Sequence, residues 1–246
     1  MPKQGEISYL KNIGKEGIDH ASNKPFSDAN CGKYLMDLGA IFQLLPPPPA
    51  KPLDLGCGTG WTSCMFAKRG YDVAAQDICP DMIDCANKNK LKEGLQSVNF
   101  IVLDYEDMNF DSEFDCAVFY DSLHHAVDEE AALRMVYKAL KPGGICVVVE
   151  PGKGHDKNEI SREAVKKYNV TEKEMHPGKV SKIARKIGFS SHRILPRIIY
   201  IGKAIYERPD KPILRSVFRF EILRNLAAIY IMLFGRRNHG ITVLTK

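Results

Sequence analysis

The sequence predicts an α/β fold in which a mostly parallel sheet forms the centre of a single domain of 246 residues. The stretch LDLGCGTGW, Leu53–Trp61, joins an apolar strand to a glycine-rich loop and the start of a helix. Further short apolar runs then alternate with helical patterns, as expected for parallel strands with crossover helices. A content of 44% hydrophobic and 26% charged residues supplies enough core for one such sheet.

The glycine-rich loop predicts a nucleotide-cofactor site. Gly56, Gly58 and Gly60 let the backbone turn sharply and approach a ligand where a Cβ atom would intrude. In the dinucleotide fingerprint the third glycine follows the second by three positions, whereas Gly60 follows Gly58 by two. The spacing therefore fits a dinucleotide poorly.

Acidic residues end the next two predicted strands. After a predicted helix over Thr62–Arg69, YDVAAQDI ends near Asp77, and VNFIVLDYEDM contains Asp104. Taken singly, Asp77 could be a helix cap and Asp104 a turn residue. At the carboxyl ends of successive parallel strands, however, both point into the crevice where open α/β sheets bind ligands.

Later segments complete the predicted sheet. FDCAVFYDSLHH forms a fourth strand, and LKPGGICVVVEPG, Leu140–Gly152, forms a turn and a fifth. Helical patterns over Lys157–Tyr168 and Gly178–Ile187 precede SSHRILPRII, the sixth strand, and HGITVLTK, His239–Lys246, is the candidate seventh.

These motifs together resemble the class I, Rossmann-like S-adenosylmethionine-dependent methyltransferases of small-molecule type, over roughly residues 30–195. The resemblance implies a three-layer sandwich with a mostly parallel seven-stranded sheet whose last strand is antiparallel. It also implies S-adenosyl-L-methionine as cofactor and S-adenosyl-L-homocysteine as product. By the same resemblance, Asp77 binds the ribose, Asp104 the adenine amine and Tyr120 the methionine end. The cofactor-binding residues that it implies are Asp54, Gly56, Cys57, Gly58, Gly60, Asp77, Ile78, Met82, Asp104, Tyr105 and Tyr120.

The end of the fourth predicted strand supplies the candidate catalytic residues. If the acceptor is a hydroxyl, a base must take its proton, and a histidine is well tuned for this near neutral pH. The resemblance places His125, His124 and Asp121 near the acceptor. The alternative is that one histidine caps the following helix and the other packs in the crevice. No metal is expected, since nothing in the sequence shows that Asp104, Glu106, Asp107 and Asp121 converge.

The proline run and the changes in sequence pattern divide the domain, residues 1–246, into four parts. These are an N-terminal cap over 1–49, a cofactor-binding core over 50–195, a helical insertion over 196–238 and the last strand over 239–246. The proline run Pro46–Pro49 ends the cap. A helix with Tyr34, Leu38, Ile41 and Leu45 on one face precedes the run, and Lys24 and Phe26 are either part of a lid or residues of an ordinary helix-capping turn.

The insertion combines apolar residues with arginines. VFRFEILRNLAAIYIMLF is apolar around much of a helical circumference, and its edges carry Arg215, Arg219, Arg224, Arg236 and Arg237. The run Leu226–Phe234 is too short to cross a bilayer, but such a helix can lie in the interface. We expect either peripheral membrane contact through 212–237 or a buried cover helix, packed on the sheet edge or on a second subunit in a homodimer.

Charge and cysteine content restrict the remaining alternatives. The net charge of +5 is concentrated in the C-terminal third, but no nucleic-acid-binding module accompanies it, so no nucleic-acid partner is expected. Seven cysteines without a CxxC pair read as reduced core residues. The polar N-terminus favours a cytoplasmic protein, with membrane association as the alternative.

The sequence therefore predicts a methyltransferase acting on a small-molecule or glycolipid acceptor, with O-methylation of a sugar or natural product as the leading hypothesis. N- or C-methylation of a small molecule is one alternative. A non-catalytic cofactor-binding partner protein, with the insertion as its interface, is another.

Overall fold

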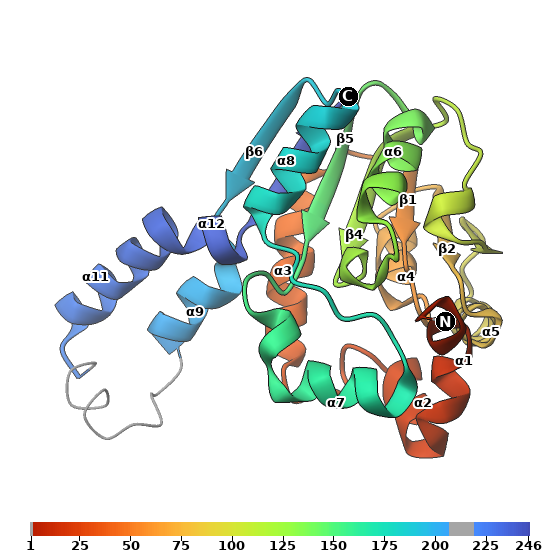
Figure 1. Ribbon diagram of the computed structural model, residues 1–246, viewed down its shortest axis with the longest axis horizontal. Coiled ribbons are helices and arrows are strands. Elements are labelled where there is room, and N and C mark those ends of the chain that lie inside the picture. The colour runs from red at the N-terminus through yellow and green to blue at the C-terminus, as the bar shows by residue number, and fades with distance from the viewer. Residues whose placement is uncertain (1, 207–218) are drawn as a thin grey trace.

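A computed structural model describes residues 2–206 and 219–246, and its centre is a seven-stranded sheet (Figure 1). The strand order is β3-β2-β1-β4-β5-β7-β6. The strands are β1 (Pro52–Leu55), β2 (Val73–Asp77), β3 (Val98–Val102), β4 (Phe114–Tyr120), β5 (Leu140–Val149), β6 (Ser191–Leu195) and β7 (Ile241–Thr245). β1 to β5 pair in parallel, whereas β7 runs antiparallel to both β5 and β6. The predicted fold, including its antiparallel last strand, is confirmed.

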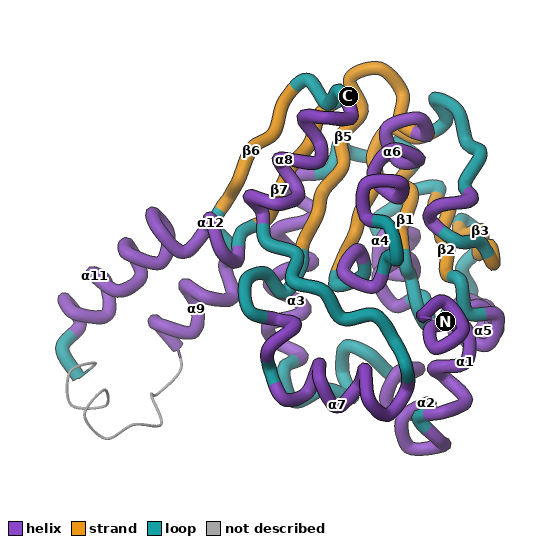
Figure 2. The backbone as a smooth tube through the Cα atoms, viewed as in Figure 1, coloured by secondary structure: helices purple, strands orange, loops and turns teal. Residues whose placement is uncertain are grey.

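Helices cover both faces of the sheet and complete the three layers (Figure 2). On one face, Leu53 and Phe119 pack with residues of α6 (Glu129–Ala139) and α8 (Pro177–Ile187). On the other, Val73 and Val118 pack with α3 (Cys31–Leu44), α4 (Trp61–Lys68) and α5 (Pro80–Lys92). Because successive strand residues point to opposite faces, apolar runs such as β4 supply both cores.

The first helices lie at the carboxyl ends of the strands. α1 (Pro2–Asn12) contacts α2 (Gly14–Ser22), α5 and α7 (Glu159–Tyr168), and Figure 1 shows α2 and α7 below the sheet. The predicted helix before the proline run is α3, which buries Leu38 and Ile41. The polar N-terminal segment is thus helical and lies over the edge where ligands bind in open α/β sheets.

The insertion projects away from the sheet (Figure 1). It contains α9 (Ile198–Tyr206), α11 (Glu221–Tyr230), a π-helical turn over Ile231–Gly235 and α12 (Arg236–His239). α11 contacts α9 and buries no residue, with Ile222 and Leu226 70% and 56% exposed. The expectation that this helix is buried on the sheet edge is therefore wrong, because its contacts are with α9 and with the π-helical turn that follows it. Arg215 lies outside the described residues.

Within residues 2–206 and 219–246, no helix is both long and apolar enough to cross a bilayer.

Candidate active site

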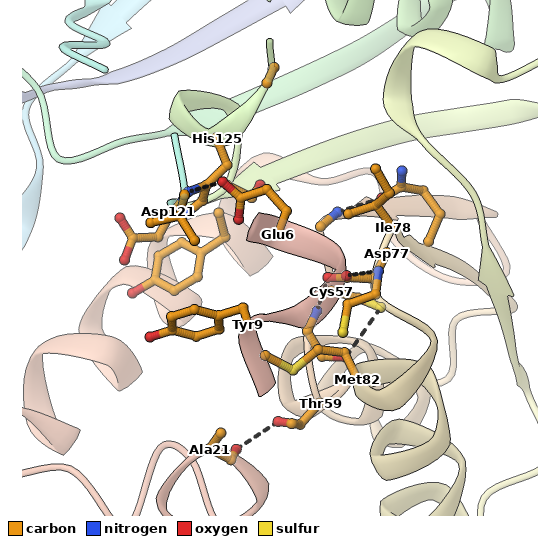
Figure 3. Close-up of a pocket in the computed structure, with 18 of the residues that line it drawn as sticks. Glu6, Tyr9, Ala21, Cys57, Thr59, Asp77, Ile78, Met82, Asp121 and His125 are labelled. Carbon is orange, nitrogen blue, oxygen red and sulfur yellow. Dashed lines mark hydrogen bonds and ion pairs between the residues drawn. The ribbon is translucent and has the colours of Figure 1, made fainter. Parts of the chain in front are cut away.

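A cavity of about 500 Å³ lies at the carboxyl ends of β1, β2 and β4, under α1 and α2 (Figure 3). Its wall combines the glycine loop with residues that follow β2, β3 and β4, and with Lys3, Glu6 and Tyr9 of α1. Segments far apart in the sequence therefore enclose one space. Eleven of the predicted site residues line it, namely Gly56, Cys57, Gly58, Asp77, Ile78, Met82, Asp104, Tyr105, Tyr120, Asp121 and His125.

The glycine loop is held in place from β2. Gly56 donates its N–H to the Gln76 side-chain oxygen at 2.7 Å, and Gly58 donates its N–H to Asp77 Oδ2 at 2.9 Å. Gly58 has a φ of +53°, and apart from Gly58 itself and its two chain neighbours no atom of the described residues lies within 4 Å of the position that a Cβ would take there. The backbone of Gly58 therefore faces open space and leaves room for a ligand.

Asp77 connects the loop to the end of β2. Its Oδ1 accepts the N–H of Cys79 at 2.9 Å, while Oδ2 accepts that of Gly58. Burial raises the pKa of Asp77 above its ordinary value, and these two backbone hydrogen bonds oppose the rise. Each carboxylate oxygen has a further lone pair, so Asp77 can also accept a hydroxyl from the cavity.

Lys3 closes the cavity beside the end of β3. Its ammonium lies 2.6 Å from Asp104 Oδ2 and 2.8 Å from Glu106 Oε2. The hydrogen bond to Asp104 is the main cause that raises the pKa of Lys3. Tyr105, next to Asp104, donates its hydroxyl to the Ser122 carbonyl at 3.2 Å. Asp104, for which the resemblance implied an adenine contact, is thus paired with a cation from α1.

The end of β4 carries two residues in the cavity wall. Tyr120 donates its hydroxyl to Asp37 Oδ2 at 3.1 Å. Asp121 has a φ of +55°, a left-handed conformation that costs energy for a residue other than glycine and is common at functional sites. Burial would raise the pKa of Asp121, but its electrostatic interactions with His124 and Arg197 hold that pKa below its ordinary value.

His125 lines the cavity and lies among acceptors. Its Nδ1 is 2.7 Å from the Thr171 carbonyl and 3.4 Å from Glu6 Oε1. Burial alone would lower the pKa of His125, but Glu6 and Glu172 raise it to about 9. At neutral pH this imidazole is therefore better suited to donate a hydrogen bond than to take a proton.

Three predicted site residues lie outside the cavity wall. Asp54 is 1% exposed and accepts the hydroxyls of Thr62 and Ser63 at 2.6 Å each, so it fixes the start of α4. A Cβ on Gly60 would clash with Phe100 and Ala86, which makes this glycine a requirement of packing. His124 is 3% exposed and lies behind His125.

Several residues near the site were not predicted. Lys3 and Glu6 lie in a polar segment without a motif, and Glu172 lies in a loop before α8. Glu150 directly follows the apolar strand β5 and accepts backbone N–H groups from Ser122 and Leu123 at 3.1 and 2.8 Å. Its position at a strand end, like that of Asp77, was the one signal in the sequence that could have found it.

The strand order and the cavity at the ends of β1, β2 and β4 define a class I methyltransferase fold. Residues 53–148 match the family described as "Methyltransferase domain". This segment is a class I S-adenosylmethionine-dependent methyltransferase domain, as the resemblance implied.

Curated relatives match part of the chain. The ubiquinone biosynthesis O-methyltransferase of Xanthomonas axonopodis pv. citri is 35% identical over 102 residues, which are 41% of this chain and 42% of the relative. The ubiquinone/menaquinone biosynthesis C-methyltransferase UbiE of Methylococcus capsulatus is 34% identical over 125 residues, 48% of this chain and 49% of the relative. The chain thus spans less than half the length of these relatives.

Solved structures share the fold over more of the chain. Phosphoethanolamine N-methyltransferase 2 of Haemonchus contortus, in complex with S-adenosyl-L-methionine, gives a TM-score of 0.66 at 21% identity and covers 97% of this chain and 59% of that one. The [4+2]-cyclase SpnF gives a TM-score of 0.57 at 20% identity, with 88% and 81% covered. At these identities the likeness shows the fold alone.

Proposed function

We propose that the protein is an S-adenosylmethionine-dependent methyltransferase that methylates an oxygen of a small or lipid-linked metabolite, such as a sugar or a natural product. The observation that carries this proposal is the single cavity that joins the glycine loop and Asp77 to Asp121 and His125. A cofactor and an acceptor can therefore meet in one enclosed space, and holding two reactants together is the main requirement of a direct methyl transfer.

The loop and β2 fit S-adenosylmethionine. Gly58 leaves open space next to the backbone, and Asp77 keeps lone pairs that can accept ribose hydroxyls. When bound, the cofactor supplies an activated methyl group on its sulfonium. Tyr120, fixed by Asp37, lines the same wall and would orient the methionine end.

Asp121 supports an oxygen acceptor. Its strained backbone keeps it in the wall directly after β4, where its carboxylate can accept the hydrogen of an acceptor hydroxyl. Relatives named as ubiquinone O- and C-methyltransferases agree with a small-molecule acceptor. The sugar acceptor in the proposal does not come from the names of these relatives.

The projecting insertion supports a lipid-linked acceptor as a second form of the proposal. Phe220, Leu226 and Phe234 are more than half exposed, and the segment carries Arg219, Arg224, Arg236 and Arg237. Exposed apolar residues beside arginines favour an anionic lipid surface. A second copy of the chain is the other candidate partner for this face.

The test combines binding and transfer. We expect calorimetry to detect S-adenosylmethionine binding, and methyl-labelled cofactor to label the lipid or small polar fraction of a cell extract in an alkali-stable ether. Label on nitrogen or carbon would contradict the oxygen acceptor and support N- or C-methylation instead. Binding without label in any fraction would favour a non-catalytic partner protein, and absence of binding would contradict the proposal.

A further inference from the structure

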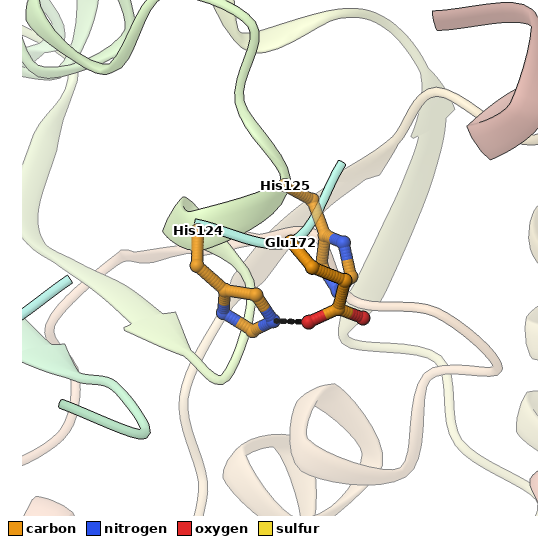
Figure 4. Close-up of side chains that lie close together, drawn as sticks. All are labelled: His124, His125 and Glu172. Atoms are coloured by element: carbon orange, nitrogen blue, oxygen red, sulfur yellow. Dashed lines mark ion pairs between the residues drawn. The ribbon is translucent and has the colours of Figure 1, made fainter. Parts of the chain in front are cut away.

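Two histidines and a glutamate lie close together beside the cavity (Figure 4). His124 and His125 are successive residues in the turn after β4, and Glu172 comes from the loop between α7 and α8. One ligating atom of each lies within 4.8 Å of those of the other two. In particular, His124 Nε2 is 3.7 Å from Glu172 Oε2.

The Nδ1 atoms of both rings already have hydrogen-bond partners. His124 Nδ1 lies 2.6 Å from Glu150 Oε2, and His125 Nδ1 lies 2.7 Å from the Thr171 carbonyl oxygen. Because a carbonyl only accepts hydrogen bonds, Nδ1 of His125 carries a proton, and loss of the second ring proton leaves a lone pair on Nε2. The Glu150 carboxylate selects the same tautomer of His124. Metal-bound histidines are oriented by second partners of this kind.

The surroundings also hold the carboxylate in position. Glu172 Oε2 lies 2.5 Å from His155 Nε2, so a third histidine orients it. His124 and Glu150 are each 3% exposed, whereas His125 and Glu172 reach the cavity wall. The cluster is therefore buried on one side and open to a ligand on the other, as expected for a metal site with free coordination positions.

We propose that His124, His125 and Glu172 bind a divalent transition-metal ion such as Zn²⁺ or Fe²⁺. Two imidazoles and one carboxylate form a donor set that suits these ions and leaves positions open. On binding, the ion would displace protons from the imidazoles. The ion would then supply the positive charge beside the Glu172 carboxylate. No metal was expected from the sequence, since the acids weighed there do not include Glu172.

A role for the ion follows if the proposed function holds, and this step rests on it. An ion at these residues faces the cavity that also contains Asp121. It would hold an oxygen of the acceptor and lower the pKa of its hydroxyl, whose proton would leave to a base or to water. The oxygen would then take the methyl group as the S–CH₃ bond of the cofactor breaks and S-adenosylhomocysteine leaves. The fitting acceptor class is a hydroxyl compound, above all one with a second oxygen next to the reacting one.

Cobalt provides a test that does not depend on activity. Chelator-treated protein is titrated with Co²⁺, and bound ion is followed by its visible absorption and by elemental analysis. We expect one Co²⁺ per chain, with affinity reduced at least about tenfold in Glu172→Gln and in His125→Ala. His192→Ala is the matched control, since His192 lies on β6 beside Arg185, and its affinity should equal that of the unaltered protein.

The outcomes separate this inference from the proposed function. Circular dichroism checks that each variant is folded. Because two ligand variants are tested, the experiment still decides if one of them does not fold. Binding well below one ion per chain, or equal binding in all variants, would overturn the metal site. Calorimetry with S-adenosylmethionine on the metal-free protein tests the cofactor independently, so its failure would remove the proposed function and leave the metal result intact.

Discussion

Asp77 accepts the backbone N–H of Gly58 at 2.9 Å, so the acid at the end of β2 holds the glycine loop at the end of β1. Its second oxygen is bonded to the N–H of Cys79. One carboxylate therefore fixes the loop and faces the cavity that we assign to the cofactor.

Replacement of Asp77 tests the cofactor site. We expect Asp77→Ala to weaken S-adenosylmethionine binding roughly tenfold to a hundredfold, since a hydrogen bond to a charged group contributes about 1.5–3 kcal/mol. Calorimetry measures the change. Asp84→Ala, on the exposed face of α5, is the control and should bind normally. Unchanged affinity in Asp77→Ala would remove this residue from the site.

A comparison of Gly58 with Gly143 distinguishes the effect of ligand contact on cofactor affinity from the effect of backbone strain on stability. Gly58 and Gly143 both have positive φ, +53° and +78°, with no described atom within 4 Å of the position that a Cβ would take. Alanine at either position should cost about 1 kcal/mol of unfolding free energy. We expect Gly58→Ala alone to weaken cofactor binding, because only Gly58 lines the cavity. Equal affinities for the two variants would mean that the loop faces another ligand.

The buried Asp54 predicts a pH dependence of stability. Burial raises the pKa of Asp54 to about 6, against opposing hydrogen bonds from Ser63 and Thr62. A raised acid pKa means that the folded state binds the proton more tightly than the unfolded state. This contribution to stability is therefore present at low pH and is lost as the pH rises through about 6.

Asp54→Asn should remove that pH dependence. We expect the unfolding free energy of the unaltered protein to lose up to about 3 kcal/mol relative to the variant between about pH 4 and pH 6. Urea denaturation at several pH values measures this, and Asp84→Asn is the control. Parallel curves for Asp54→Asn and the unaltered protein would contradict the raised pKa.

A buried ion pair fixes helix α3 of the cap to the segment between β6 and α9. Arg197 lies 2.6 Å from Asp37 Oδ2, and the two side chains are 8% and 1% exposed. We expect Arg197→Met to lose about 3–5 kcal/mol of unfolding free energy, because it leaves a buried charge unpaired. The double variant Asp37→Leu/Arg197→Met should recover most of the loss in denaturant titrations. Arg134→Met removes an exposed pair with Glu130 and should cost less than about 1 kcal/mol.

The projecting helices α9 and α11 predict lipid binding. We expect the protein to sediment with anionic vesicles at low salt, and Leu226→Glu/Ile229→Glu to abolish this, since both residues are exposed on α11. Leu91→Glu changes an isolated residue that is 74% exposed on α5 and should leave binding unchanged. Absence of vesicle binding, with a dimer in ultracentrifugation that the double variant dissociates, would assign the face to a second copy.

The sheet and the cofactor side of the cavity could be predicted because their signals are local. An apolar run ending in an acid, as at Asp77, shows both a buried parallel strand and the edge where its last side chain lies. Glu172 carries no such signal, since it reaches His124 and His125 only through the path of a long loop. The apolar pattern of α11 indicated a helix, but periodicity does not show which surface, if any, covers it.

Arg197 also connects the insertion to the cavity. It directly precedes α9, the first helix of the projecting insertion, yet its guanidinium binds Asp37 and donates to the Glu150 carbonyl at 3.0 Å. Asp37 in turn holds Tyr120 in the cavity wall. One guanidinium therefore links the start of α9, through Asp37, to a side chain that lines the cavity, so the insertion and the cavity wall share a single buried attachment point.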